Sequence, residues 1–135
     1  MIENLLNPLT FAQFVTSLFL AVLFLQSGID KVVDFSGNLS WLKSHFSKSP
    51  LRSQVKLMLI AITVAEVLAG ALALVGAAQI AMTGAKSLAL FGAQLAAIDI
   101  LLLFFGQRIA KDYAGAAVLV PYFILCVAEV LLLSH

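Results

Sequence analysis

Residues 56–76 read KLMLIAITVAEVLAGALALVG, an apolar stretch with a single acid, Glu66, near its middle. About 20 residues of α-helix cross a hydrocarbon layer of about 30 Å, so this stretch is long enough to span a membrane. It must be helical there, because unpaired backbone groups cannot face lipid. Comparable stretches cover about residues 9–33, 86–105 and 114–133. The sequence therefore predicts an all-α integral membrane protein, a four-helix bundle that forms a single domain over residues 1–135.

The composition excludes a water-soluble fold and argues against binding to nucleic acid. Hydrophobic residues make up 62% of the 135 residues, and charged residues make up 11%. A soluble domain has about 45–50% apolar and about 25% charged residues. A chain of this size cannot bury so much apolar surface in its own core, so lipid must solvate part of it. The net charge is only +1, and the chain has no basic cluster of the kind that nucleic acid requires.

The segment between the first two stretches has apolar side chains at helical spacing and polar ones largely opposite. The apolar positions are Phe35, Leu39, Leu42 and Phe46. This pattern, with Lys43 on the other side, is typical of a helix that lies in the plane of the membrane interface. We therefore predict an interfacial helix over about residues 35–49, with Trp41 and Phe46 as its anchors.

Lysine and arginine are unevenly distributed between the two ends of the predicted helices. One end carries Lys31, Lys43, Lys48, Arg52, Lys56, Arg108 and Lys111, and the other carries Lys86. Cytoplasmic segments of membrane proteins carry the excess of positive charge. We therefore expect a multi-pass protein of the bacterial inner membrane with both termini outside the cytoplasm. No basic residue precedes the first stretch, which favours a retained helix over a signal peptide.

Alanine recurs every four residues along the second and third stretches. The positions are Ala61, Ala65, Ala69, Ala73 and Ala77, then Ala85, Ala89, Ala93 and Ala97. Residues four apart share one helix face, and small side chains let membrane helices approach closely. We interpret these rows as the contact between two antiparallel helices. The alternative is that alanine is simply common in membrane helices.

Polar side chains inside the apolar stretches mark positions that lipid does not face. A charged side chain at the bilayer centre costs about 2.5–3.5 kcal/mol on insertion scales, so such an acid is protonated, paired or hydrated. The depth of each polar residue follows from the helical rise per residue, counted from the cytoplasmic end of its predicted helix. This count places one group of polar residues in the middle-to-cytoplasmic half of the bundle. The group consists of Gln26, Glu66, Asp99 and Tyr122. We predict that these residues line one pocket, with Asp30 and Lys31 at its mouth.

Two interpretations of this cluster stay open. In the first, the acids hydrogen-bond to other polar groups and hold the bundle in register. In the second, they bind a polar head group, a quinone ring or a proton. Lys31 has an alternative of its own, an interfacial ion pair with Asp30 or Asp34. Glu129 lies near the opposite end, where it either belongs to a separate site or reaches the interface.

The sequence contains no zinc spacing, catalytic triad or phosphate loop. Its single cysteine, Cys126, excludes an intramolecular disulfide, and we expect it to be a small buried side chain. The two histidines, His45 and His135, fall on opposite sides of the membrane and cannot share a metal ion. We therefore predict no metal site and assign no catalytic residue.

Residues 24–31, FLQSGIDK, the amphipathic segment up to Pro50 and residues 66–70, EVLAG, together resemble the DoxX/DoxD-like membrane proteins. Members of that family are small four-helix proteins. They typically have Gly-x-x-Lys near the end of the first helix and a Glu with following glycines in the second. In this chain the corresponding residues are Gly28, Lys31, Glu66, Gly70 and Gly76.

The resemblance implies a range of roles. DoxD-like members are associated with thiosulfate:quinone oxidoreductase, others accompany oxidative-stress or thiol-redox systems, and distant relatives act as receptor-assembly factors. This chain lacks the paired cysteines that related redox bundles use. We therefore expect a non-catalytic subunit or assembly partner of a membrane redox or stress system, in contact with a membrane protein partner or a second copy.

Two alternatives remain. One is a quinone-linked oxidoreductase subunit of the thiosulfate:quinone type, in which Glu66 or Asp99 relays a proton. The other is a small lipid-binding or transport protein.

Overall fold

The computed structural model describes residues 2–134 and contains no strand in that range. Its elements are α1 (Ile2–Leu6), α2 (Pro8–Val33), α3 (Phe35–His45), the 3-10 turn η1 (Arg52–Gln54), α4 (Val55–Thr83), α5 (Ser87–Ile109) and α6 (Tyr113–Leu133). Helices α2, α4, α5 and α6 are long and apolar enough to cross a membrane. The predicted fold class, an all-α membrane bundle, is confirmed.

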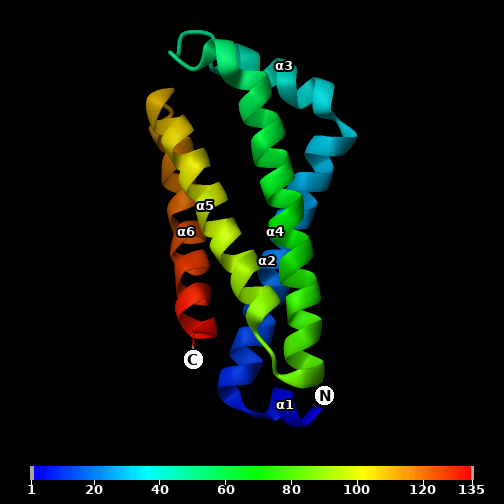
Figure 1. Ribbon diagram of the computed structural model, residues 1–135. Coiled ribbons are helices and arrows are strands. Elements are labelled where there is room, and N and C mark those ends of the chain that lie inside the picture. Colours follow the sequence, from blue (N-terminus) through cyan, green and yellow to red (C-terminus); the bar gives the residue numbers. More distant parts are fainter. Residues whose placement is uncertain (1, 135) are drawn as a thin grey trace.

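The long helices pack in sequence, α2 against α4, α4 against α5 and α5 against α6. Figure 1 shows both chain ends at one end of the bundle and α3 across the other. We call these the terminal end and the α3 end. The α3 end also holds η1 and the α5–α6 turn. It carries the seven lysine and arginine residues that the sequence analysis assigns to the cytoplasmic side. Lys86 lies in the α4–α5 turn at the terminal end.

Local sequence sets where these helices begin and end. The side chain of Asn7 accepts hydrogen bonds from the backbone N–H groups of Leu9 and Thr10, which caps the start of α2. Gly84 follows α4 with φ of 76°, a left-handed conformation that glycine adopts without strain. Helix α4 therefore runs to Thr83. The sequence analysis predicts an end at about residue 76, which is too early.

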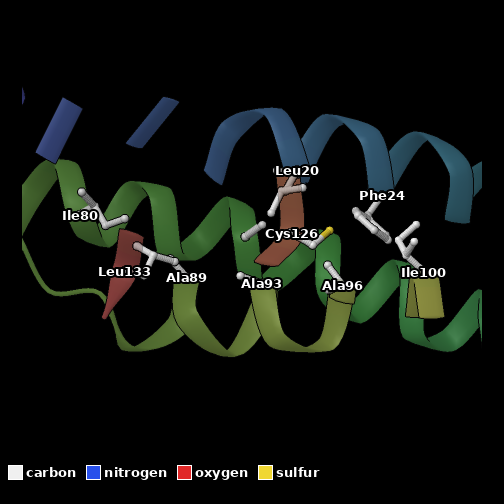
Figure 2. Close-up of a cluster of buried hydrophobic side chains, with 12 residues drawn as sticks. Leu20, Phe24, Ile80, Ala89, Ala93, Ala96, Ile100, Cys126 and Leu133 are labelled. Atoms are coloured by element: carbon white, nitrogen blue, oxygen red, sulfur yellow. The ribbon is translucent and has the colours of Figure 1, made fainter. Parts of the chain in front are cut away.

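The core is made of small side chains where α4 meets α5. A β-carbon at Gly76 would lie only 2.3 Å from the backbone nitrogen of Ala89, so the two backbones are in contact. This contact explains why Gly76 lies inside α4 and does not end it. Most of the predicted alanine rows are buried here, at Ala69, Ala73, Ala77, Ala89 and Ala93. Figure 2 shows members of this cluster between the helices.

Toward the α3 end the facing side chains become larger, and α4 and α5 diverge (Figure 1). Alanine gives way to Leu59 and Ile62 on α4, and to Ile100 and Leu103 on α5. The divergence leaves a surface groove of about 320 Å³, which we call the α4–α5 groove. Its lining includes Leu57, Met58, Ala61, Ile62, Leu102 and Phe105. Leu57, Leu102 and Phe105 are exposed, so the groove opens to the lipid.

Helix α3 crosses the end of the bundle, and His45 connects it to α5 and to the α5–α6 turn. The carboxylate of Asp34 accepts a hydrogen bond from the backbone N–H of Gly37, which caps α3. His45 Nε2 lies 3.0 Å from Gln107 Oε1 and 3.4 Å from Asp112 Oδ2. Trp41 stacks on the His45 ring and is exposed on its other side.

The interfacial helix is shorter than predicted, and one of its expected anchors faces inward. Helix α3 ends at His45, four residues before the predicted end at about residue 49, and the chain then turns. Because Phe46 lies in that turn, its side chain points under α3, where it is only 5% exposed and lines a cavity with Lys31. The prediction that Phe46 anchors the interface is therefore wrong.

Candidate functional site

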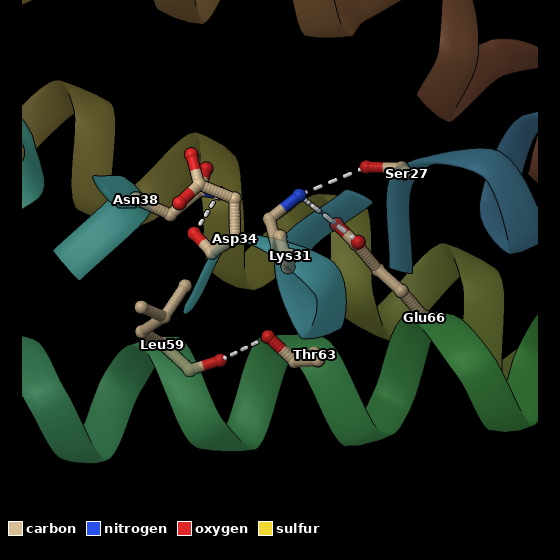
Figure 3. A network of polar contacts seen from close by, with 7 residues as sticks. All are labelled: Ser27, Lys31, Asp34, Asn38, Leu59, Thr63 and Glu66. Carbon is tan, nitrogen blue, oxygen red and sulfur yellow. Dashed lines mark hydrogen bonds and ion pairs between the residues drawn. The ribbon is translucent and has the colours of Figure 1, made fainter. Parts of the chain in front are cut away.

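An ion pair joins α2 to α4 in the α3-end half of the bundle. Lys31 Nζ lies 3.0 Å from Glu66 Oε2 and 3.3 Å from Oε1, and it donates a hydrogen bond of 2.9 Å to Ser27 Oγ. Figure 3 shows Lys31 between these two partners. The side chain of Glu66 is 3% exposed and that of Lys31 is 20% exposed. The expected alternative, an ion pair of Lys31 with Asp30 or Asp34, is wrong.

A close helix crossing positions this pair. A β-carbon at Gly28 would lie 2.7 Å from Val67 Cγ2 and 3.4 Å from Glu66 Cβ, so α2 and α4 cross closely at this glycine. Lys31 follows Gly28 by three residues and lies on the same helix face. Its side chain therefore extends along the crossing to Glu66. The Gly-x-x-Lys spacing thus places the close crossing and the ion pair on the same face of α2.

Two small cavities lie beside the ion pair. The first, of about 80 Å³, has Lys31, Phe46 and Gln107 among its lining residues. The second, of about 130 Å³, is lined on its polar side by Ser27, Glu66 and Tyr122. Each cavity has room for a few water molecules. Each is smaller than a typical pocket for a drug-sized ligand, which has a volume of about 300–1,000 Å³.

The first cavity borders the α4–α5 groove. The two share Met58, Ile62, Leu102 and Gly106 in their linings. The cavity beside Lys31 and the lipid-facing groove are therefore neighbours that share apolar walls. The groove by itself reaches the size range of ligand sites. Among the residues within 2–134 that line the cavity or the groove, only Lys31 is charged, and it lines the cavity.

Asp99 lies level with Glu66 on the neighbouring helix. A β-carbon at Gly92 of α5 would lie 2.9 Å from the backbone nitrogen of Ala73 of α4. Because the helices are antiparallel, moving seven residues along each from this contact leads to Asp99 and Glu66. Asp99 is fully buried, and neither carboxyl oxygen has a hydrogen-bond partner in the described part of the chain.

A second polar cluster lies between α2 and α6 toward the terminal end. Ser17 Oγ donates a hydrogen bond of 2.8 Å to Glu129 Oε1, and Gln13 Nε2 donates one of 2.8 Å to the carbonyl oxygen of Leu132. Glu129 is 1% exposed, and its Oε2 has no partner within residues 2–134. Glu129 thus belongs to a separate cluster, and the alternative that it reaches the interface is wrong.

Comparison with known families bears on this geometry directly. The DoxX family model matches residues 13–99, well over half of the chain, and the match includes Gly28, Lys31 and Glu66. The chain belongs to the DoxX family. No curated protein and no solved structure matches it. The α2–α4 crossing and its ion pair therefore lie within the family-defining part of this DoxX protein.

The structure brings together only part of the predicted pocket. Glu66 and Tyr122 line one cavity, whereas Gln26 and Asp99 do not line it. Gln26 is exposed, because it precedes Gly28 by two residues and so lies on the side of α2 away from α4. Asp30 is also exposed. The binding role of all these residues stays a prediction.

Sequence reasoning missed Ser27, Ser17 and Gln13, the hydroxyl and amide side chains near the buried acids. Ser27 precedes Lys31 by four residues, and Gln13 precedes Ser17 by the same spacing. Each pair therefore shares a helix face. Once the inward face of α2 is known, this spacing indicates which polar side chains lie near the buried acids. In the first pair Lys31 contacts Glu66 and donates a hydrogen bond to Ser27. In the second pair Ser17 donates to Glu129, and Gln13 donates to the carbonyl oxygen of Leu132.

No group of three His, Cys, Asp or Glu that could hold a metal is found within residues 2–134. His135, which the sequence analysis places opposite His45, lies outside the described residues. Cys126 is a free, fully buried thiol, as predicted, and has no contact with the surface.

Proposed function

We propose that this DoxX protein is a non-catalytic subunit or assembly partner of a membrane redox or stress system. In that role, its bundle holds the polar head of an amphipathic molecule beside Lys31 and Glu66. One observation carries the proposal: the Lys31–Glu66 ion pair stands beside a cavity that shares its apolar walls with a groove open to lipid. We infer that groove and cavity form the path by which the ligand reaches Lys31. The α3 end faces the cytoplasm of a bacterial inner membrane, and the bias of basic residues toward that end supports this orientation.

The chemistry of the path selects the ligand. Its walls are apolar, as an isoprenoid or acyl chain requires, and Lys31 offers a cationic hydrogen-bond donor at its end. The head of the ligand must therefore present acceptor oxygens. A quinone ring carries carbonyl oxygens, and a lipid head group carries phosphate or carbonyl oxygens. A quinone and a lipid therefore each combine a hydrogen-bond-accepting oxygen with an apolar tail.

The chain's own residues favour a supporting role over catalysis. Cys126 is its only cysteine, so dithiol chemistry within one chain is excluded. The buried thiol has no route to a reactant. Electrons or a substrate would therefore come from a partner protein, and this bundle would hold the lipid-soluble molecule on which that partner acts.

Purification from the native membrane in mild detergent, followed by mass spectrometry of everything that accompanies the protein, tests the proposal. We expect a bound quinone or phospholipid and a stoichiometric redox or assembly partner. The Lys31→Met variant should lose the small molecule and keep the partner. A wild-type protein with neither small molecule nor partner would refute the proposal, and the identity of the small molecule separates the quinone from the lipid.

A second candidate function is favoured by Asp99, a buried acid whose carboxyl oxygens lack partners within the described range. In this candidate the protein is a quinone-linked oxidoreductase subunit. A donor such as thiosulfate, oxidised at the partner, gives electrons to the quinone, and each quinone takes up protons as it becomes quinol. Asp99 and Glu66 would pass those protons through the bundle, as acid–base groups do in catalysis.

Thiosulfate-dependent quinone reduction in membranes separates this candidate from the first. If Asp99 relays protons, Asp99→Asn should slow the reduction while leaving quinone retention unchanged. Membranes in which the rate is independent of this protein would eliminate the candidate and leave the first proposal untouched.

A further inference from the structure

Two glutamines in the membrane-spanning helices point away from the bundle. Gln13 and Gln107 form hydrogen bonds inside the chain, whereas Gln26 and Gln94 are exposed and have no hydrogen-bond partner within residues 2–134. Gln94 stands seven residues from Ser87, the start of α5, which places it roughly 10 Å in from the terminal end. A primary amide at that depth faces hydrocarbon, which offers it neither donor nor acceptor.

Gln94 stands in a shallow groove between α5 and α6. The groove has a volume of about 440 Å³, and its other lining residues are Ala97, Ile98, Val127 and Val130. We call this surface the Gln94 face. The small side chain of Ala97 lies next to the amide, so a helix from another molecule can approach closely. The face therefore combines a polar group that needs a partner with a shape that admits one.

We propose that the Gln94 face is the contact between two copies of this chain, related by a twofold axis along the membrane normal. Copies of one membrane protein share one orientation, so this axis brings each residue opposite its own copy at equal depth. A glutamine amide has both an acceptor oxygen and a donor NH₂ group. Two Gln94 side chains therefore satisfy each other through a reciprocal pair of N–H···O hydrogen bonds.

The depth of Gln26 excludes it as the partner of Gln94. Gln26 precedes Val33 by seven residues, and Gln94 precedes Ile109 by fifteen, so they lie roughly 10 Å and 22 Å from the α3 end. Two copies in one membrane cannot bring these amides together without sliding one copy along the normal. In the central part of the described spans no other polar side chain is exposed, so the matching group on this chain is Gln94 itself.

This contact is independent of the proposed function. The α4–α5 groove lies toward the α3 end of α5, around Leu102 and Phe105, whereas the Gln94 face lies in the terminal half of the same helix. Dimer formation therefore leaves the lipid path to Lys31 open. Failure of ligand binding and failure of dimer formation can be observed separately.

Disulfide cross-linking in native membranes tests the inference. The only native cysteine is removed by Cys126→Ala, and a cysteine is placed on the Gln94 face by Ile98→Cys. The matched control is Phe19→Cys on α2. Ile98 and Phe19 each stand eleven residues inside their helices from the terminal end and are 55% and 52% exposed, respectively. Copper phenanthroline should produce a covalent dimer from Ile98→Cys and none from Phe19→Cys.

Adding Gln94→Leu to the Ile98→Cys protein removes the amide but keeps an apolar side chain of similar size. Because interhelical hydrogen bonds contribute about 1–2 kcal/mol in model membrane peptides, the cross-linked fraction should fall about five- to thirtyfold. Co-purification of two differently tagged copies should weaken in parallel, while thermal unfolding of the protomer should not change.

Three outcomes would overturn the inference. The first is a dimer yield from Ile98→Cys no higher than from Phe19→Cys. The second is a yield that Gln94→Leu leaves unchanged. The third is a photoreactive residue at position 98 whose main adduct is a different membrane protein, which would assign the Gln94 face to that partner.

Discussion

Gly28 of α2 and Val67 of α4 lie so close together that a β-carbon on the glycine would come within 2.7 Å of Val67 Cγ2. The distance is shorter than ordinary van der Waals contact, so Val67 would have to shift to admit a larger residue at position 28. The Lys31–Glu66 ion pair forms one turn further along α2. The helix crossing and the candidate site are therefore one structural unit.

Gly28→Ala should loosen the α2–α4 crossing and lower the midpoint of thermal unfolding in detergent. Overpacking of a tight contact costs about 1–3 kcal/mol. Gly106→Ala is the matched control, because a β-carbon there would lie 3.9 Å from its nearest neighbours. That variant should be neutral, or more stable by up to about 1 kcal/mol through better helix propensity. Equal destabilisation by both variants would contradict the close crossing.

Lys31→Met should destabilise the protein more than the double variant Lys31→Met/Glu66→Gln. Removing one partner of a buried ion pair costs up to about 3–5 kcal/mol, because it leaves an uncompensated charge inside the protein. The partial exposure of Lys31 should place the effect toward the lower end of that range. Unfolding free energies of the wild type, both single variants and the double variant give the coupling energy. Additive effects of the two single changes would show that the ion pair is not formed.

Ser17→Ala should destabilise the protein by about 1–3 kcal/mol, since it leaves Glu129 Oε1 buried without its donor. The double variant Ser17→Ala/Glu129→Leu replaces both polar groups with apolar ones and should recover most of the loss. The measurement is again the free energy of unfolding in detergent. A double variant less stable than Ser17→Ala would mean that Glu129 has a structural partner besides Ser17.

Cysteine accessibility should show the α3 end in the cytoplasm. In a Cys126→Ala background, Lys48→Cys reports on the α3 end, and Ala85→Cys reports on the α4–α5 turn; both positions are exposed. An impermeant maleimide added to intact cells should label Ala85→Cys and should label Lys48→Cys only after the cells are opened. The reverse pattern would place the termini inside.

The architecture could be predicted because it depends on properties that each segment carries by itself. Length and hydropathy define the spans, and the four-residue spacing of alanine marks the face on which α4 meets α5. Even here, Gly76 misled the prediction of the end of α4, because a glycine that ends a helix and one that admits a neighbouring helix look alike in sequence. Only the structure shows that Gly76 contacts Ala89 and that Gly84 provides the cap.

The candidate site could be predicted only in part, because its composition depends on how far each helix is rotated and tilted. Depth along the helix groups Glu66 with Tyr122, and both line one cavity. Depth alone, however, does not show which way a side chain points. Gln26 illustrates the limit: its depth fits the pocket, yet it lies on the opposite face of α2 from Gly28. Likewise Lys31 passes over its near neighbours Asp30 and Asp34 because the helix crossing directs it to Glu66.

The most direct measurement is the affinity of the purified protein for a short-chain quinone and for a short-chain phospholipid, compared among the wild type, Ala61→Trp and Ala117→Trp. Ala61 is exposed and lines the α4–α5 groove, whereas Ala117 is exposed on α6 outside that groove. If the groove leads the ligand to Lys31, one of the two probes binds the wild type saturably. Ala61→Trp then weakens that binding by about tenfold or more, equivalent to about 1.4 kcal/mol, while Ala117→Trp leaves it unchanged. Saturable binding that Ala61→Trp does not alter, or no saturable binding of either probe, would contradict the account.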